Sequence, residues 1–138
     1  MVSFDLYTME AVSGFGCVLR VRDENFEKNG EQYGNRIPGV WFTTNSFKIY
    51  VGASMNWDAN KVYSAGKANQ YNWTNFQISQ TFADDQFLFE VYRNGEKRQR
   101  VVNYDTRIFY NVTAFMCHSN NPAAALIRNL SITTHSSK

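Results

Sequence analysis

Apolar and polar residues alternate with a period of two along much of this chain, as expected for extended strands with one buried face. The clearest such stretch runs from Gln86 to Tyr92, where every second side chain is apolar. It is followed by Asn94 and Gly95, the pair that best adopts the two positive φ angles of a type I′ turn. The pattern therefore predicts a hairpin in which the chain returns antiparallel from Lys97 to Tyr104.

The same alternation predicts strands in six further parts of the chain. They are Val2 to Met9, Phe15 to Arg22, Val40 to Thr43, Phe47 to Val51, Ile108 to Cys117 and Ala125 to Thr133. The first is expected to pair with the last and to form a sheet edge, through which two copies of the chain could form a homodimer. Val18 is expected to face outward. Ser54 to Tyr71 shows little periodicity and is predicted to be a long loop.

Length, composition and charge define the class of protein. The 138 residues suit a single domain, which we assign to residues 1–133, with Thr134 to Lys138 as a flexible tail. Aromatic residues make up 16% of the chain and there are only 2 prolines, which favours an all-β fold over a helical bundle. A net charge of +2 argues against nucleic acid as the partner, and the absence of a long apolar run argues against membrane insertion.

Four segments follow one another in an order that is similar to that of a known family. They are Trp73 to Gln80, Phe87 to Gly95, Phe109 to Val112 and Ile127 to Ile132. Their order and spacing resemble the C-terminal half of laminin-G-like domains of the concanavalin A-like lectin superfamily, over roughly residues 38 to 133. The resemblance implies a jelly-roll sandwich of two antiparallel sheets, and an activity of binding rather than catalysis.

Three Asn-x-Ser/Thr sequons indicate an extracellular chain. They begin at Asn72, Asn111 and Asn129, although three sequons can also arise by chance in a chain rich in Asn, Ser and Thr. The first residues lack the features of a signal peptide, so we expect a secreted or cell-surface segment of a larger protein whose signal lies elsewhere. The two cysteines, Cys17 and Cys117, either close a loop of about 100 residues as a disulfide or remain two unpaired thiols.

The irregular stretch carries the residue types of a sugar-binding loop. Aromatic rings can stack on the C–H face of a sugar, while amides and carboxylates hydrogen-bond its neighbouring hydroxyl groups. The candidate glycan-binding residues are Asn56, Trp57, Asp58, Asn60, Tyr63 and Tyr71. In the alternative interpretation, the aromatic residues anchor the loop and the polar residues cap its turns.

The same loop is a weak candidate for calcium, and no other cofactor is predicted. Asn56, Asp58 and Asn60 offer alternating oxygen ligands, and the laminin-G-like resemblance implies one calcium ion at a rim of the sandwich. Three ligands fall short of the roughly six to eight that Ca²⁺ takes, so a site at Asp58 would be weak. Asp84 and Asp85, between two predicted strands, are interpreted as a solvated turn.

Basic residues cluster around the predicted hairpin. They are Arg93, Lys97, Arg98, Arg100 and Arg107. With Glu96 as the opposing charge, the hairpin carries about +3 before Arg107 is counted. Such a patch could bind a sulfated polysaccharide or a sialylated glycan, because Arg pairs bidentately with sulfate and carboxylate groups. The alternative is a charged sheet edge that discourages aggregation.

The sequence contains no familiar catalytic arrangement. Glycosidases need two facing carboxylates, whereas on neighbouring strand positions of one face we find only Glu90, with Asp84 and Asp85 outside the strand. His118 is near no residues arranged as a triad, and the His-x-Asn-x-Arg strand of galectins is absent. We therefore predict a non-enzymatic, extracellular recognition module that binds a glycan or glycoprotein. The alternative is a structural or protein-protein adhesion domain with no sugar site.

Overall fold

The structure is a computed structural model of the whole chain. It describes residues 1–10, 15–23, 39–43, 48–52, 62–67, 70–102, 112–116 and 124–133. Most of the described residues lie in strands, and these strands pair antiparallel. The all-β prediction is therefore confirmed for this part of the chain. The predicted tail, Thr134 to Lys138, lies outside the described residues.

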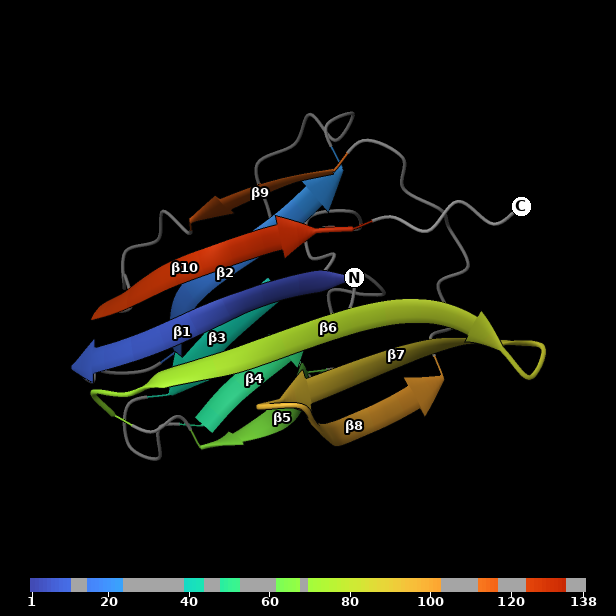
Figure 1. Cartoon of the computed structure of the whole chain (residues 1–138), viewed down its shortest axis with the longest axis horizontal. Coiled ribbons are helices and arrows are strands. Elements are labelled where there is room, and N and C mark those ends of the chain that lie inside the picture. The colour runs from blue at the N-terminus through green and yellow to red at the C-terminus, as the bar shows by residue number, and fades with distance from the viewer. Residues whose placement is uncertain are drawn as a thin grey trace.

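The strands form two five-stranded antiparallel sheets (Figure 1). The first sheet has the order β10 (Ala124–Ile132), β1 (Val2–Glu10), β6 (Trp73–Ala83), β7 (Gln86–Arg93) and β8 (Glu96–Val102). The second has the order β5 (Val62–Lys67), β4 (Lys48–Gly52), β3 (Gly39–Thr43), β2 (Phe15–Asp23) and β9 (Val112–Met116). Within the part of the chain that is described, no helix is long and apolar enough to cross a membrane.

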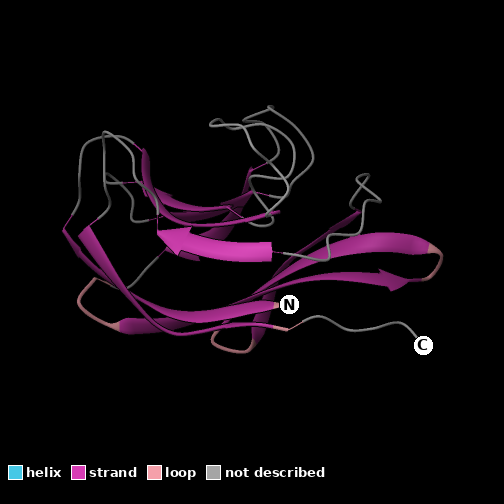
Figure 2. Ribbon diagram, turned by 90° about the horizontal axis from the view of Figure 1, so that it is seen from above, coloured by secondary structure: helices cyan, strands magenta, loops and turns pink. Residues whose placement is uncertain are grey.

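The two sheets share one hydrophobic core. Figure 2 shows them as two layers, and the buried cluster takes side chains from both. Its members are Val2, Phe4, Leu6, Phe76, Ile78, Phe89 and Val91 of the first sheet, and Val18, Leu19, Val21 and Val40 of the second. Each fully buried side chain of this size stabilises the fold by about 1.5–3 kcal/mol relative to an exposed one. The apolar positions of the alternating pattern therefore hold the two layers together.

The predicted hairpin between β7 and β8 is confirmed. Asn94 and Gly95 have φ angles of 49° and 81°, as a type I′ turn requires. Asp84 and Asp85, between β6 and β7, also have positive φ angles, of 52° and 57°, and both are exposed. Their interpretation as a solvated turn is therefore confirmed as well.

One part of the prediction for the N-terminal strand is confirmed and the other part is wrong. β1 pairs with the C-terminal strand β10, as expected, but its other side pairs with β6. It is therefore an interior strand and not the sheet edge through which a dimer was expected to form. The edges of the first sheet are β10 and β8. The alternation of β1 shows that one face is buried, but alternation does not reveal how many neighbouring strands are present.

Two local predictions are wrong. The stretch from Ser54 to Tyr71 contains a strand, β5, which pairs with β4 at the edge of the second sheet. An edge strand has a neighbour on one side only, so a short and partly polar sequence can form it. Val18 is buried rather than outward, because the register of β2 against β3 shifts between Cys17 and Leu19. A bulge of this kind interrupts the strict alternation of side chains.

Candidate functional site

Most of the predicted sugar-binding loop lies outside the described residues. This holds for Asn56, Trp57, Asp58 and Asn60, and therefore for the weak calcium candidate at Asp58. Tyr63 lies in β5, but its side chain is not described. Tyr71 is exposed just before β6, and its backbone N–H donates a 2.9 Å hydrogen bond to the carbonyl of Thr8. Among the described residues, no group of three or more His, Cys, Asp and Glu side chains could hold a metal ion.

A different group of residues comes together on the outer face of the first sheet, which is the face away from the core. The Asp5 carboxylate accepts a 2.9 Å hydrogen bond from Asn75 Nδ2 at one oxygen. Its other oxygen accepts hydrogen bonds of 2.8 Å from Asn129 Nδ2 and 3.2 Å from Arg128 Nε. We call these four residues the Asp5 network. It joins β6, β1 and β10, which lie side by side in Figure 1.

Strand register explains why these side chains meet. Asp5 is directly opposite Asn75 on one neighbour and Arg128 on the other. The flanking residues of β1 point into the core, so Asp5 must point outward. Asn129 adopts a left-handed φ of 53°, which Asn tolerates better than most residues, and the register of β1 against β10 shifts at this point. Two successive residues of β10 thus reach the same carboxylate.

The network keeps Asp5 ionised. The hydrogen bond from Asn75 is the largest cause that lowers the pKa of Asp5, followed by the hydrogen bond from Asn129. Partial burial opposes this shift, and Arg128 supports it through a hydrogen bond and its charge. Only 16% of the Asp5 side chain is exposed. The carboxylate is therefore a fixed acceptor whose hydrogen bonds hold three strands together.

Aromatic side chains lie directly beside the Asp5 network. Tyr7 of β1 is opposite Trp73 of β6, and their ring centroids are 5.2 Å apart. The Arg128 guanidinium lies 4.0 Å from the centroid of the Trp73 ring, a cation–π contact. Trp73 remains 37% exposed, and Leu126, opposite Tyr7 on β10, is exposed as well. We call the Asp5 network together with Tyr7 and Trp73 the outer-face site.

Sequence reasoning missed the outer-face site. Its members are 70 to 124 positions apart along the hydrogen bonds of the Asp5 network, so no local motif contains them. The available signal was the outward position of Trp73, between the exposed Asn72 and the buried Thr74. That signal becomes informative only when β6 is known to lie beside β1.

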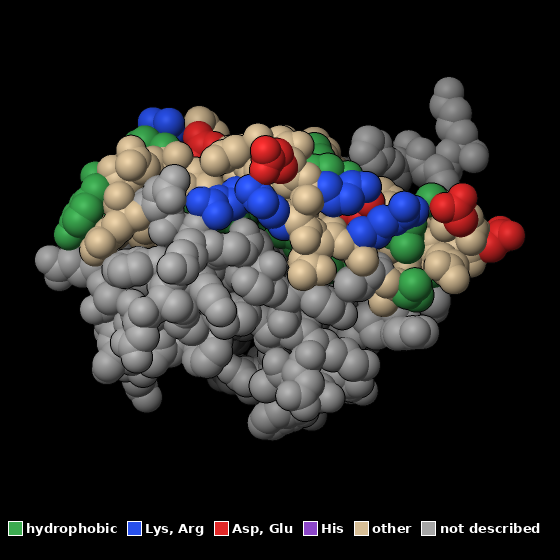
Figure 3. All heavy atoms as spheres, turned by 90° about the horizontal axis from the view of Figure 1, so that it is seen from below, with side chains coloured by type: hydrophobic (Ala, Val, Ile, Leu, Met, Phe, Trp, Pro, Cys, Tyr) green, Lys and Arg blue, Asp and Glu red, His purple; other side chains and the backbone are tan. Residues whose placement is uncertain are grey.

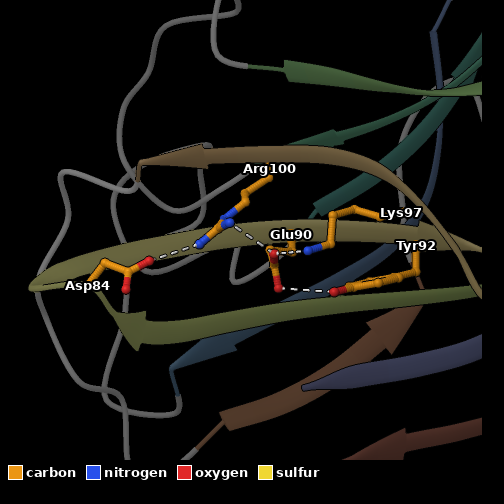
Figure 4. Close-up of polar contacts among 5 residues, drawn as sticks. All are labelled: Asp84, Glu90, Tyr92, Lys97 and Arg100. Atoms are coloured by element: carbon orange, nitrogen blue, oxygen red, sulfur yellow. Dashed lines mark hydrogen bonds and ion pairs between the residues drawn. The ribbon is translucent and has the colours of Figure 1, made fainter.

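The basic hairpin residues form a second group, shown in Figure 4. One carboxylate oxygen of Glu90, on β7, forms an ion pair with Lys97 Nζ at 2.6 Å. The other oxygen accepts a 3.1 Å hydrogen bond from the Tyr92 hydroxyl. Arg100 lies between two carboxylates, at 3.6 Å from Glu90 and 3.5 Å from Asp84. We call these five residues the Glu90 cluster. Lys97 is the first cause of a lowered pKa at Glu90, and the same hydrogen bond raises the pKa of Lys97.

These contacts change the charge that the basic patch presents. Arg98 contacts Glu96 at 2.7 Å, so Lys97, Arg98 and Arg100 each face a carboxylate. The hairpins contain four cations, with Arg93 half-buried, against the four carboxylates Asp84, Asp85, Glu90 and Glu96. Figure 3 shows the mixture of Lys, Arg, Asp and Glu along this side of the molecule. The near-neutral balance favours the charged-edge interpretation over a polyanion site. Arg107 lies outside the described residues.

The predicted modification sites are partly described. Asn72 is exposed in the turn before β6, and Asn129 is exposed on β10, whereas Asn111 lies outside the described residues. Cys17 lies in β2, with its side chain not described, and Cys117 lies outside the described residues. β2 pairs with β9, which ends at the residue before Cys117. The disulfide stays a prediction.

Comparison of the chain with protein-family models, with curated proteins and with solved structures finds no match. The laminin-G-like resemblance therefore stays a prediction, and the functional interpretation depends on the geometry of the described residues.

Proposed function

We propose that this chain is a jelly-roll β-sandwich that binds carbohydrate without transforming it, and that the outer-face site is its binding surface. The sandwich is supported by the two five-stranded sheets and by the core that draws on both of them. The proposal keeps the recognition module of the laminin-G-like resemblance, but it places the contact surface on a sheet face instead of a rim loop.

One observation carries the proposal. An exposed aromatic side chain, Trp73, lies beside amide, carboxylate and guanidinium groups that are already fixed by hydrogen bonds to one another. Sugar recognition needs an apolar ring surface next to fixed polar groups, because a sugar offers a C–H face and adjacent hydroxyl groups. The entropy of ordering these side chains has been lost on folding, so binding does not incur that cost.

A binding role suits the two half-buried carboxylates of this face better than catalysis does. Asp5 and Glu90 both have lowered pKa values because they accept hydrogen bonds. A general acid for glycoside cleavage needs a raised pKa in order to stay protonated near neutral pH. Neither carboxylate is suited to that task.

Trp73 and Phe82 provide a matched test, because both are exposed aromatic residues of β6 and lie near its two ends. We expect the wild-type chain to give specific signals on a glycan array and Trp73→Ala to weaken them about tenfold, since a contact with one aromatic ring contributes on the order of 0.5–1.5 kcal/mol beyond the area that it buries. Phe82→Ala should bind like the wild type. The proposal is wrong if the wild type binds no glycan, or if both variants lose binding equally.

Exposed leucines favour a second candidate function, protein-protein adhesion. Leu126 and Leu130 are both exposed on β10, an edge strand of the first sheet. An edge strand with apolar side chains can pair with another chain. A silent glycan array together with concentration-dependent self-association in analytical ultracentrifugation would support this alternative.

We also propose that the chain acts outside the cell. The exposure of Asn72, in the turn before β6, supports this, because a glycosylated sequon has to lie on the surface. Asn129 is exposed too, but its Nδ2 donates to Asp5 within the outer-face site. Mass spectrometry of the chain secreted from a glycosylating host would test it. Unmodified Asn72 in that material would argue against it.

A further inference from the structure

Arg128 differs from Arg98 and Arg100 in how its guanidinium is held. Its Nε donates to Asp5 at 3.2 Å, and its guanidinium lies over the Trp73 ring at 4.0 Å. These two contacts fix one edge and one face of the Arg128 guanidinium. Among the described residues, no hydrogen-bond partner is found for the two terminal nitrogens, and 52% of the side chain is exposed. By contrast, Arg100 and Arg98 each use a terminal nitrogen in an ion pair.

A guanidinium held in this way is prepared for one kind of ligand. Its planar fork matches the two oxygens of a carboxylate, and a fixed fork loses little entropy when it binds. The Asp5 carboxylate does not compete strongly, because both of its oxygens already accept hydrogen bonds and it is mostly buried. A ligand that approaches the exposed part of Trp73 must also meet Arg128, since the guanidinium lies over that ring.

We propose that the outer-face site selects sugars that carry a carboxylate, of the uronic acid or sialic acid class, through the terminal nitrogens of Arg128. This rests on the proposed carbohydrate-binding function. The sugar ring contacts the exposed part of Trp73, and the carboxylate accepts two hydrogen bonds from Arg128.

Charge balance favours a carboxylate over a sulfated polymer. Sulfated chains are attracted by clusters of unpaired positive charge, and that attraction is long-ranged and sensitive to salt. The charges of Asp5 and Arg128 cancel, and the nearby hairpins carry equal numbers of cations and carboxylates. The attraction that remains between Arg128 and an acidic ligand is therefore short-ranged. Its strength depends on the geometry of the contact, as it does in a single bidentate pair.

The experiment measures dissociation constants by titration calorimetry for four soluble oligosaccharides: one with glucuronic acid, one with sialic acid, a matched neutral sugar and a sulfated sugar. We expect the wild type to bind at least one acidic sugar about tenfold more tightly than the neutral sugar, because hydrogen bonds between charged groups are stronger than neutral ones. Arg128→Gln should remove this preference, so that the dissociation constants of the acidic and the neutral sugar lie within about twofold of each other. Arg128→Lys should keep only part of the preference for the acidic sugar, because an ammonium group cannot form two parallel hydrogen bonds to a carboxylate as a guanidinium does.

Asp85→Asn is the control for charge, because it changes the net charge by one in an exposed turn between β6 and β7, outside the outer-face site. It should leave all four constants unchanged, and thermal melting should show that each variant is folded. Equal binding of acidic and neutral sugars, tighter binding of the sulfated sugar, or dependence on Arg98 and Arg100 instead of Arg128 would overturn the inference while leaving the proposed function intact. If no sugar binds, the proposed function fails first.

Discussion

Two half-buried carboxylates on the same face of the first sheet are held in different ways. Asp5 is 16% exposed and Glu90 is 13% exposed. The partners of Asp5 come from two other strands and are 70, 123 and 124 positions away in the sequence. Those of Glu90 include Tyr92, 2 positions away, and Lys97, 7 positions away, in the same hairpin. Hydrogen bonds to a carboxylate therefore join strands from distant parts of the sequence around Asp5. Around Glu90, they stabilise a single hairpin.

The difference extends to the cations. Arg100 is shared between Glu90 and Asp84, so the Glu90 cluster uses its positive charges internally. The Asp5 carboxylate accepts mainly from neutral amides, and no hydrogen-bond partner of the Arg128 terminal nitrogens is found among the described residues. A carboxylate that is bound by amides can thus position an arginine for a ligand, whereas one that is bound by several cations cannot.

Replacement of the central carboxylates should separate the two regions most clearly. Asp5→Ala removes the acceptor of three donors that join three strands, and we expect it to lower the free energy of unfolding by about 2–3 kcal/mol. Glu90→Ala should lower it by about 1 kcal/mol, because Lys97 and Arg100 can turn to water. Urea unfolding followed by tryptophan fluorescence measures both. An equal or larger loss for Glu90→Ala would contradict the contrast.

The turn between β7 and β8 supports both regions and should show a smaller effect. The Asn94 backbone N–H donates to the carbonyl of Asn75 at 2.9 Å, and its side-chain oxygen accepts from the Asn75 N–H at 2.9 Å. Gly95 has a φ of 81° and nothing within 4 Å of an added Cβ, so a side chain there meets backbone strain but no clash. Gly95→Val should therefore destabilise the chain by about 1–2 kcal/mol.

Gly95→Asn is the control for that strain, since Asn tolerates a left-handed φ better than Val does. It should lose less than half as much stability as Gly95→Val in the same urea unfolding assay. If the two variants were equally destabilised, strain at this turn would not be the cause.

Acid should weaken both regions. Asp5 and Glu90 have pKa values below their ordinary ones in the folded chain. The stability that they contribute is therefore complete above the unfolded values, near 4, and is lost as pH falls through the lower folded values. We expect the free energy of unfolding, measured in urea, to fall below pH 4 by about 0.5–1 kcal/mol for each carboxylate. The double variant Asp5→Asn with Glu90→Gln should have a flatter pH profile, and a profile as steep as that of the wild type would contradict this.

The same contrast explains what the sequence could predict. Asn94 and Gly95 place β8 beside β7, so the neighbours of Glu90 lie within one hairpin, although a register shift between Val91 and Tyr92 brings Arg100 opposite Glu90. The neighbours of Asp5 depend on which strands flank β1 and on a register shift in β10. These are decided by packing of the whole core. The positive charge of the hairpin was overestimated for a related reason, because Glu90 and Asp84 were not counted among its neighbours.

The strand pattern was the most predictable part of the fold, and the exceptions have physical reasons. Buried faces alternate clearly, so the strands that form the core, apart from β6, were located within a few residues of their observed bounds. β5 was missed because an edge strand needs few apolar side chains. The outer-face site was missed because outward positions are not constrained by burial, and their meaning depends on neighbouring strands.

The smallest effect is expected at the exposed pair of Arg98 and Glu96, whose side chains are 44% and 71% exposed. A double-mutant cycle with alanine should give a coupling energy of about 0–0.5 kcal/mol there, because solvent screens the pair and ordering two long side chains offsets the attraction. The same cycle on Arg128 and Asp5 should give about 1 kcal/mol or more, since Asp5 is mostly buried and the guanidinium is also held by Trp73. Equal couplings would mean that Arg128 is held no more firmly than an ordinary surface arginine, and the Asp5 network would then have no advantage over the Glu90 cluster in presenting a fixed guanidinium to a ligand.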